Sequence, residues 1–195
     1  MGLPCVFVRL TACNLRCTYC DTEYAFYEGG EQTLENIVEE IRSYNCNLVE
    51  ITGGEPLLQE EVYELMKRLC DAGYEVLLET GGHILVDRVD LRVKKIIDVK
   101  TPSSGMMKHN EERNLDLATS SDEIKFVIGT REDYDWAKQI IAKHNLSEKL
   151  TVLMSVTFSE LALQELAEWI LHDRLKVRFQ LQMHKFIWHP LTRGV

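Results

Sequence analysis

Short apolar segments alternate along the chain with longer segments in which apolar residues recur every three or four positions. The short segments predict β-strands, and they cover residues 5–10, 48–52, 74–79, 95–99, 123–128, 150–156 and 177–181. The first of them is almost continuously apolar, a pattern typical of a strand that is covered on both faces.

The segments with helical periodicity lie between these strands. Hydroxyl side chains precede three of them and are expected to cap the helices: Thr33, Thr130 and Ser159. The aligned apolar residues are Leu34, Ile37, Val38 and Ile41 in the first helix, Val62, Leu65, Met66 and Leu69 in a second that stops at Gly73, Trp136, Ile140 and Ile141 in a third, and Leu163, Leu166, Trp169 and Ile170 in a fourth. Residues 86–93 are too few for a full helix, and residues 106–122 show no clear apolar period, so the helical layer is expected to be thin there.

Strands that alternate with helices in this way indicate parallel βαβ units. Residues with special chemistry follow the ends of successive strands, namely Cys13, Gly53, Thr80 and Ser103. Barrel enzymes assemble their sites at that edge. We therefore expect an α/β fold, a partial TIM-like barrel of about six parallel strands with a reduced helical coat. The uncovered wall would expose apolar surface, which favours a homodimer.

Composition and charge narrow the classes of function. A chain of 195 residues with 45% hydrophobic content is expected to form a single domain over residues 1–195. A net charge of −9 argues against a nucleic-acid partner. The uncharged stretches are too short to span a membrane, and the N-terminus lacks the layout of a signal peptide, so a cytoplasmic location is expected. In that compartment Cys5, Cys46 and Cys70 are interpreted as free buried thiols.

The other three cysteines share one loop. Cys13, Cys17 and Cys20 have the spacing C-x3-C-x2-C, and no fourth cysteine is near. A zinc site of this size normally has four ligands, whereas a 4Fe-4S cluster held by three thiolates leaves one iron open. The loop resembles that of the radical S-adenosylmethionine (SAM) enzymes, in which the open iron chelates SAM. The alternative is a redox-inert metal knot or a set of buried thiols.

Residues after the later strands suggest contacts for such a cofactor. Gly53 and Gly54 would let a ligand approach the backbone, and the carboxylate of Glu55 could take an ammonium group. Thr80 and the segment with Lys100, Pro102 and Ser103 supply hydroxyls and backbone groups, although ordinary turn chemistry would explain them equally well without a cluster.

Two further residues suggest a substrate. Arg9 is a cation at the end of an apolar strand, where a buried guanidinium would need a carboxylate from a ligand or from a structural Glu. His184 could hydrogen-bond a heterocycle or be an ordinary core histidine.

Nearly the whole chain is similar to the 7-carboxy-7-deazaguanine synthase family. The segments that carry the resemblance are residues 2–9, Cys20-Asp21-Thr22, Thr52-Gly53-Gly54-Glu55-Pro56-Leu57, Pro102-Ser103-Ser104-Gly105 and Leu181-Gln182-x-His184-Lys185. The resemblance implies conversion of 6-carboxy-5,6,7,8-tetrahydropterin into 7-carboxy-7-deazaguanine, with a 4Fe-4S cluster, SAM and Mg²⁺. An external electron donor of the flavodoxin or ferredoxin type is then expected.

The resemblance also implies roles for individual residues. Arg9 and Thr52 would hold the substrate, Thr22 the magnesium, and Gly54, Thr80, Lys100, Pro102 and Ser103 the SAM. Thr22 could instead simply cap the next turn. Family members usually begin with an additional strand carrying an Ile-Gln-Gly-Glu-like segment that contributes to the substrate pocket. This sequence begins at Met1-Gly2-Leu3-Pro4, so either the start is late or the pocket is completed differently.

Two other functions remain open at the level of sequence. A glycyl-radical-enzyme activase would share the cluster loop and the barrel, but would lack the Asp21-Thr22 and Ser103-Ser104 features. A non-enzymatic iron-sulfur electron carrier needs no SAM site, so the Gly-Gly-Glu-Pro turn counts against it.

Overall fold

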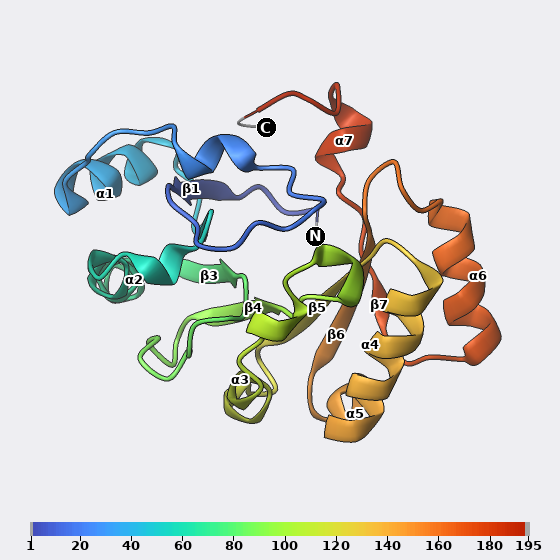
Figure 1. Ribbon diagram of the computed structural model, residues 1–195. Coiled ribbons are helices and arrows are strands. Elements are labelled where there is room, and N and C mark those ends of the chain that lie inside the picture. Colours follow the sequence, from blue (N-terminus) through green and yellow to red (C-terminus); the bar gives the residue numbers. More distant parts are fainter. Residues whose placement is uncertain (1, 194–195) are drawn as a thin grey trace.

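A single sheet of seven parallel strands organises the computed structural model, which describes residues 2–193. The strands are β1 (Val6–Leu10), β2 (Leu48–Gly53), β3 (Glu75–Thr80), β4 (Lys94–Asp98), β5 (Glu123–Ile128), β6 (Thr151–Val156) and β7 (Arg178–Phe179). They lie side by side in chain order, and β1 and β7 form the two edges. The expected partial TIM-like barrel is confirmed, with seven strands rather than about six (Figure 1).

Helices cover the outer side of this curved sheet (Figure 1). They are α1 (Leu34–Ser43), α2 (Glu61–Asp71), α3 (Arg113–Leu117), α4 (Arg131–His144), α5 (Leu146–Lys149) and α6 (Leu163–Asp173). Helix α7 (His184–Ile187) instead lies beyond the end of the sheet, where Lys185 contacts Asp21 (Figure 1). The connection between β3 and β4 has no helix, and α3 is a single short turn, so the layer is thin where the sequence predicted it. Within the described residues no helix is long and apolar enough to cross a membrane.

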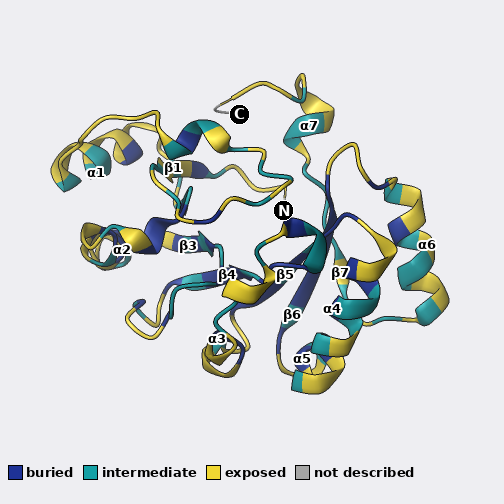
Figure 2. Cartoon of the chain, in the orientation of Figure 1, coloured by how far each residue is buried: buried dark blue, intermediate teal, exposed yellow. Residues whose placement is uncertain are grey.

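The strand register divides each strand into two faces. On the outer face Ile51, Leu78, Ile97 and Ile124 are buried against the helices. Their neighbours in sequence point to the concave inner face, because side chains alternate along a strand. Figure 2 shows the central strands as the buried part of the molecule and the outer faces of the helices as exposed.

Two of the predicted helix caps are confirmed. The Thr33 hydroxyl accepts a hydrogen bond from the Asn36 N–H, and Thr130 forms a capping box with Asp133 at the start of α4. The third prediction is wrong. Ser159 has φ +69° and lies within a turn, and α6 begins at Leu163 after Ala162 without a side-chain cap.

The prediction that the first strand is covered on both faces is also wrong. Strand β1 is an edge strand, and its inner-face residues Phe7 and Arg9 are exposed, Phe7 by 53%. A run of apolar residues at an edge therefore leaves apolar surface open. Cys5, Cys46 and Cys70 are free thiols as expected, but each is only partly buried.

Candidate functional site

The three-cysteine loop leaves the C-terminal end of β1 and lies directly against the Gly-Gly-Glu-Pro turn after β2. The Gly54 N–H donates to the Leu10 carbonyl at 3.0 Å, and the Glu55 N–H donates to the Ala12 carbonyl at 2.8 Å. A Cβ on Gly54 would lie 2.3 Å from the Ala12 carbonyl oxygen and 2.8 Å from Cys13 Cβ. Glycine is therefore required for this close approach.

A second set of contacts fastens the loop to the turn after β4. Thr18 donates its hydroxyl to the Ser103 carbonyl at 2.7 Å and its N–H to the Ser104 carbonyl at 3.1 Å. The turn itself is 3-10 helix η3 (Pro102–Ser104), and buried Asp133 accepts hydrogen bonds from both the N–H and the hydroxyl of Ser103. The loops after β1, β2 and β4 thus form one hydrogen-bonded unit.

Cys13, Cys17 and Cys20 are free and partly buried within this unit. Burial raises the pKa of Cys17, and the neighbouring Cys20 and Cys13 thiolates add to the rise while Lys100 opposes it. The three thiols belong to the same loop. No group of three or more His, Cys, Asp and Glu residues within positions 2–193 is arranged to hold a single metal ion. Three neighbouring thiols without a fourth protein ligand fit a cluster with one open iron.

Glu55 is fully buried and has only uncharged hydrogen-bond donors. The N–H groups of Leu57 and Gly81 donate at 3.0 and 2.8 Å, and the Thr80 hydroxyl lies 2.9 and 3.0 Å from the two carboxylate oxygens. Burial raises the pKa of this carboxyl, and these donors oppose the rise. A fixed buried carboxylate with no ion-paired Lys or Arg among the described residues is suited to a cationic ligand.

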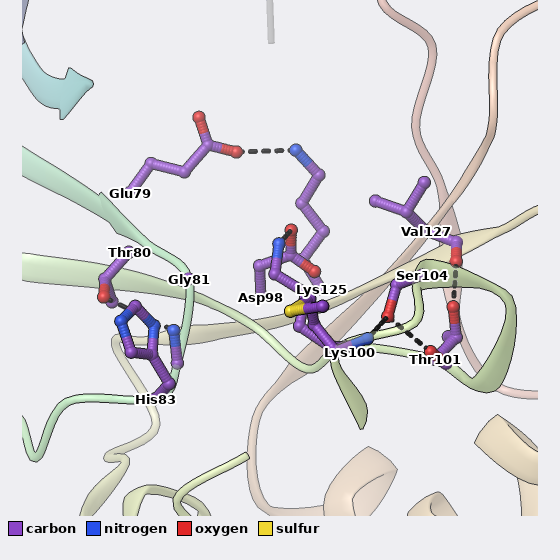
Figure 3. A network of polar contacts seen from close by, with 12 residues as sticks. Glu79, Thr80, Gly81, His83, Asp98, Lys100, Thr101, Ser104, Lys125 and Val127 are labelled. Carbon is purple, nitrogen blue, oxygen red and sulfur yellow. Dashed lines mark hydrogen bonds and ion pairs between the residues drawn. The ribbon is translucent and has the colours of Figure 1, made fainter. Parts of the chain in front are cut away.

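Charged side chains line the inner face of the sheet (Figure 3). Lys125 donates to Glu79 at 2.6 Å, and Lys100 donates to Asp98 at 2.7 Å. Burial alone would lower the pKa of Lys125. The Glu79 and Asp98 carboxylates outweigh the effect of burial, so the pKa of Lys125 is raised. Thr52 donates to Glu79 at 3.4 Å. The concave face therefore presents ordered donors and acceptors below the cysteine loop.

Glu50 lies on this same face, because it comes two residues before Thr52 in β2. Burial and then the Glu79 carboxylate raise its pKa to about 8, while Lys125 opposes the rise. Glu50 is thus mostly protonated near neutral pH and can donate a hydrogen bond there.

Arg9 and Thr52 are paired in the register of β1 and β2, so both side chains point to the inner face. The expectation of a buried Arg9 is wrong, because β1 is an edge strand and Arg9 is exposed. Within residues 2–193 it has no ion-pair or hydrogen-bond partner. Burial, then Lys185 and to a smaller degree Arg9 lower the pKa of His184, while Asp21 opposes the fall. Arg9 and Thr52 therefore lie together on the inner face, and His184 begins α7 next to Lys185, which contacts Asp21.

Thr22 follows the last cysteine and precedes 3-10 helix η1 (Glu23–Phe26), but its side chain does not cap that helix. Its hydroxyl instead donates to Asp21 at 3.0 Å. The other Asp21 oxygen accepts from Gln182 at 2.8 Å and Lys185 at 3.1 Å. Residues from both ends of the chain thus meet beside the cysteine loop.

Sequence reasoning placed Thr80 as a direct cofactor contact, whereas its hydroxyl is used to hold Glu55. It missed Glu79, Lys125 and Asp133. A signal for the first two exists, since they are charged residues inside otherwise apolar strands. The signal for Asp133 is its position three residues after the helix cap Thr130.

Comparison with known proteins agrees with this arrangement. The family model described as the radical SAM superfamily matches residues 8–170. The fold resembles crystal structures of Streptococcus suis SuiB, including one bound to S-adenosylmethionine, with a TM-score of 0.64 at 12% identity over 93% of this chain and 48% of that chain. The chain therefore spans about half the length of the solved structures that it matches, and this likeness shows the fold alone. The chain belongs to the radical SAM superfamily.

Relatives with much higher identity define the family within that class. The 7-carboxy-7-deazaguanine synthase of Chlorobaculum tepidum is 48% identical over 100% of this chain and 90% of its own length. The synthases of Koribacter versatilis and Methanospirillum hungatei are 47% and 38% identical over 100% and 97% of this chain, and 92% and 79% of their own lengths. The chain belongs to the 7-carboxy-7-deazaguanine synthase family.

Proposed function

We propose that this chain converts 6-carboxy-5,6,7,8-tetrahydropterin into 7-carboxy-7-deazaguanine, a step toward queuosine and related deazapurines. The observation that carries the proposal is the three-cysteine loop, which is hydrogen-bonded to two neighbouring strand-end loops above a polar concave face. The names of the full-length relatives support the product.

The direct test is anaerobic incubation of reconstituted protein with SAM, a reductant and carboxytetrahydropterin, followed by mass analysis. The expected product is 7-carboxy-7-deazaguanine with loss of ammonia. Cleavage of SAM without this product would contradict the proposed substrate, but it would still agree with radical SAM chemistry.

The cofactor residues divide by chemical type. Cys13, Cys17 and Cys20 would hold the 4Fe-4S cluster, and Gly53, Gly54 and Glu55 would receive the ammonium group of SAM. Thr80, Lys100, Pro102 and Ser103 would support its carboxylate and ribose. When bound, the cluster and SAM would supply the radical chemistry that removes a hydrogen atom from C6 of the substrate. The protein's task is to fix both molecules, and the hydrogen bonds between the strand-end loops hold the site rigidly.

The substrate would lie on the concave face. Arg9 would bind its carboxylate, since an exposed guanidinium without an ion pair in the described chain is free to take one. Thr52 and His184 would contact the pterin, with the Glu79–Lys125 pair close below. Polar pterins have donors and acceptors around the ring, which this face can match.

Replacing Arg9 with alanine is expected to weaken substrate binding by about 2–3 kcal/mol, or roughly 30- to 150-fold in Kd, because a charge-assisted pair is lost. SAM binding and thermal stability should be retained, since the Arg9 side chain makes no ion pair or hydrogen bond within residues 2–193 and its backbone pairing with β2 does not depend on the side chain. The measurement is equilibrium binding of the pterin and of SAM to cluster-loaded protein. The control is Arg42→Ala on the exposed face of α1. Loss of SAM binding in Arg9→Ala would show that Arg9 has a structural role.

Thr22 is the proposed protein ligand of magnesium. Its hydroxyl oxygen keeps free lone pairs after donating to Asp21, and it does not cap the following turn. Magnesium prefers oxygen ligands and keeps several waters, so one hydroxyl plus substrate oxygens is a reasonable shell. The ion would then act as a Lewis acid and template during ring contraction.

Thr22→Ala is expected to lose most of the rise in turnover that magnesium gives the wild-type enzyme, while SAM cleavage continues. Thr22→Ser restores the hydroxyl and should restore the response. Magnesium titrations of the three proteins provide the measurement. An unchanged response in Thr22→Ala would remove this residue from the metal shell.

We further propose that residues 1–195 act as one radical SAM domain in a cytoplasmic homodimer that receives electrons from a flavodoxin- or ferredoxin-type donor. Exposed Phe7 on β1 and exposed Phe186 and Ile187 on α7 support the dimer, because large apolar side chains at the surface favour association. The six free thiols support a reducing compartment.

A further inference from the structure

His83 follows β3 and is almost entirely buried, with a side chain only 6% exposed. It lies beside Thr80 and Gly81 (Figure 3). The carboxylate of Glu55, proposed above for the amino group of SAM, is also close to it. Its Nε2 atom is 2.5 Å from the side-chain oxygen of Asn14, which lies between Cys13 and Leu15 in the cysteine loop. Its Nδ1 atom is buried and meets no hydrogen-bond partner in good geometry, although the backbone of Gly81 lies close enough to oppose the fall in the pKa of the ring.

The protonation of the ring follows from these contacts. Burial and then the charge of Lys100 lower the pKa of His83 to about 4, so the ring is neutral at physiological pH. With the amide oxygen of Asn14 facing Nε2 as an acceptor, the single ring hydrogen is assigned to Nε2, which donates to it. Nδ1 therefore carries an unused lone pair in the protein interior, which is unfavourable unless a ligand donates to it.

A second acceptor faces the same place. Nδ1 lies 3.6 Å from Oε2 of Glu55, and neither atom can donate to the other when Glu55 is ionised. Gly81 leaves the gap open, because a Cβ there would lie 3.1 Å from Oε2 and 3.2 Å from Nδ1. Two buried acceptors around a small opening match a ligand that is positively charged and has several N–H donors.

We propose that His83 Nδ1 is a second acceptor for the N–H groups of the SAM amino group, next to Glu55, and that His83 links this amino-group site to the cysteine loop through Asn14. This inference rests on the SAM site proposed above. His83 is thus a further cofactor-binding residue. The competing explanation is that His83 has only a structural role, in which it holds the cysteine loop against the loop after β3.

Three substitutions separate the two explanations. Asn places an amide atom near the position of Nδ1, whereas Gln places one near Nε2. His83→Asn should therefore keep an acceptor for the ammonium and lose the contact with Asn14, and His83→Gln should do the reverse. His83→Phe keeps the ring volume and removes both contacts.

The measurement is the Kd of SAM for anaerobic, cluster-loaded protein, together with the change that SAM causes in the EPR spectrum of the reduced cluster. We expect a Kd raised about tenfold in His83→Phe and His83→Gln, and a value within about threefold of wild type in His83→Asn. The control His172→Gln changes a histidine on exposed α6 and should leave the Kd unchanged.

A SAM analogue with hydrogen in place of the amino group completes the test. Its Kd should be the same for wild type and His83→Phe, because the group that His83 contacts is missing. The proposal is overturned if His83→Phe binds SAM normally, if only His83→Gln is restored, or if all three variants fail to load the cluster. Wild-type protein that fails to bind SAM would instead overturn the proposed function.

Discussion

Cluster-loaded protein in which Cys17 is replaced by alanine is expected to show no measurable SAM cleavage. Cys17 lies between the other two thiols in sequence, and two thiolates are too few to hold a cubane with a single open iron. Iron and sulfide content after anaerobic reconstitution should fall with the activity. The 5'-deoxyadenosine released from SAM, measured by mass spectrometry, reports the loss directly.

Cys46→Ala is the matched control for this substitution. The Cys46 thiol donates only weakly, to the Pro4 carbonyl at 3.3 Å and the Leu48 carbonyl at 3.6 Å, far along the chain from the cysteine loop. This variant should load the cluster and cleave SAM as the wild type does. Equal loss in Cys17→Ala and Cys46→Ala would contradict the assignment of the cluster to Cys13, Cys17 and Cys20.

Replacing Gly54 with alanine is expected to displace the cysteine loop. The new methyl group would lie 2.3 Å from the Ala12 carbonyl oxygen and 2.8 Å from Cys13 Cβ, so the backbone itself has to move. Overpacking of this kind costs about 1–3 kcal/mol. For a chain of this length that is about 2–4 °C in Tm per kcal/mol. We expect a Tm lowered by several degrees and a cluster content well below that of the wild type, measured by calorimetry and iron analysis.

Gly30→Ala is the control, because a Cβ on Gly30 meets no atom within 4 Å and its φ is not positive. Its Tm and cluster content should match the wild type. A Gly54→Ala protein with full cluster content would show that the cysteine loop can move away from the turn after β2 and still hold the cluster. The close contact of the two loops would then not be required for the site.

The outer half of the fold could be predicted from sequence because each element there buries an apolar stripe. Val62, Leu65 and Leu69 line α2 in the expected way, and the strands between the helices were placed within about two residues. The predictions for this half were wrong where a segment is apolar in composition but not buried in the structure. Residues 5–10 have the composition of a central strand but lie at the edge of the sheet.

The inner face could not be predicted in the same way. Glu79 on β3 and Lys125 on β5 interrupt apolar strands, and their ion pair depends on the order of the strands and on the curvature that brings the two side chains together. Asp133 is recognisable as the acidic member of a capping box, but its bonds to Ser103 join helix α4 to a loop 30 positions earlier. Local patterns identify such residues without revealing their partners.

The contacts of Asp21 with Gln182 and Lys185 impose an order on maturation. The cysteine loop is made among the first residues of the chain, but two of the groups that fasten it emerge from the ribosome about 160 residues later. Until then the loop is held on one side only, by the turns after β2 and β4. The contacts of the cysteine loop with the turns after β2 and β4 can therefore form before the C-terminal segment is made, and those of Asp21 with Gln182 and Lys185 complete the loop's surroundings last.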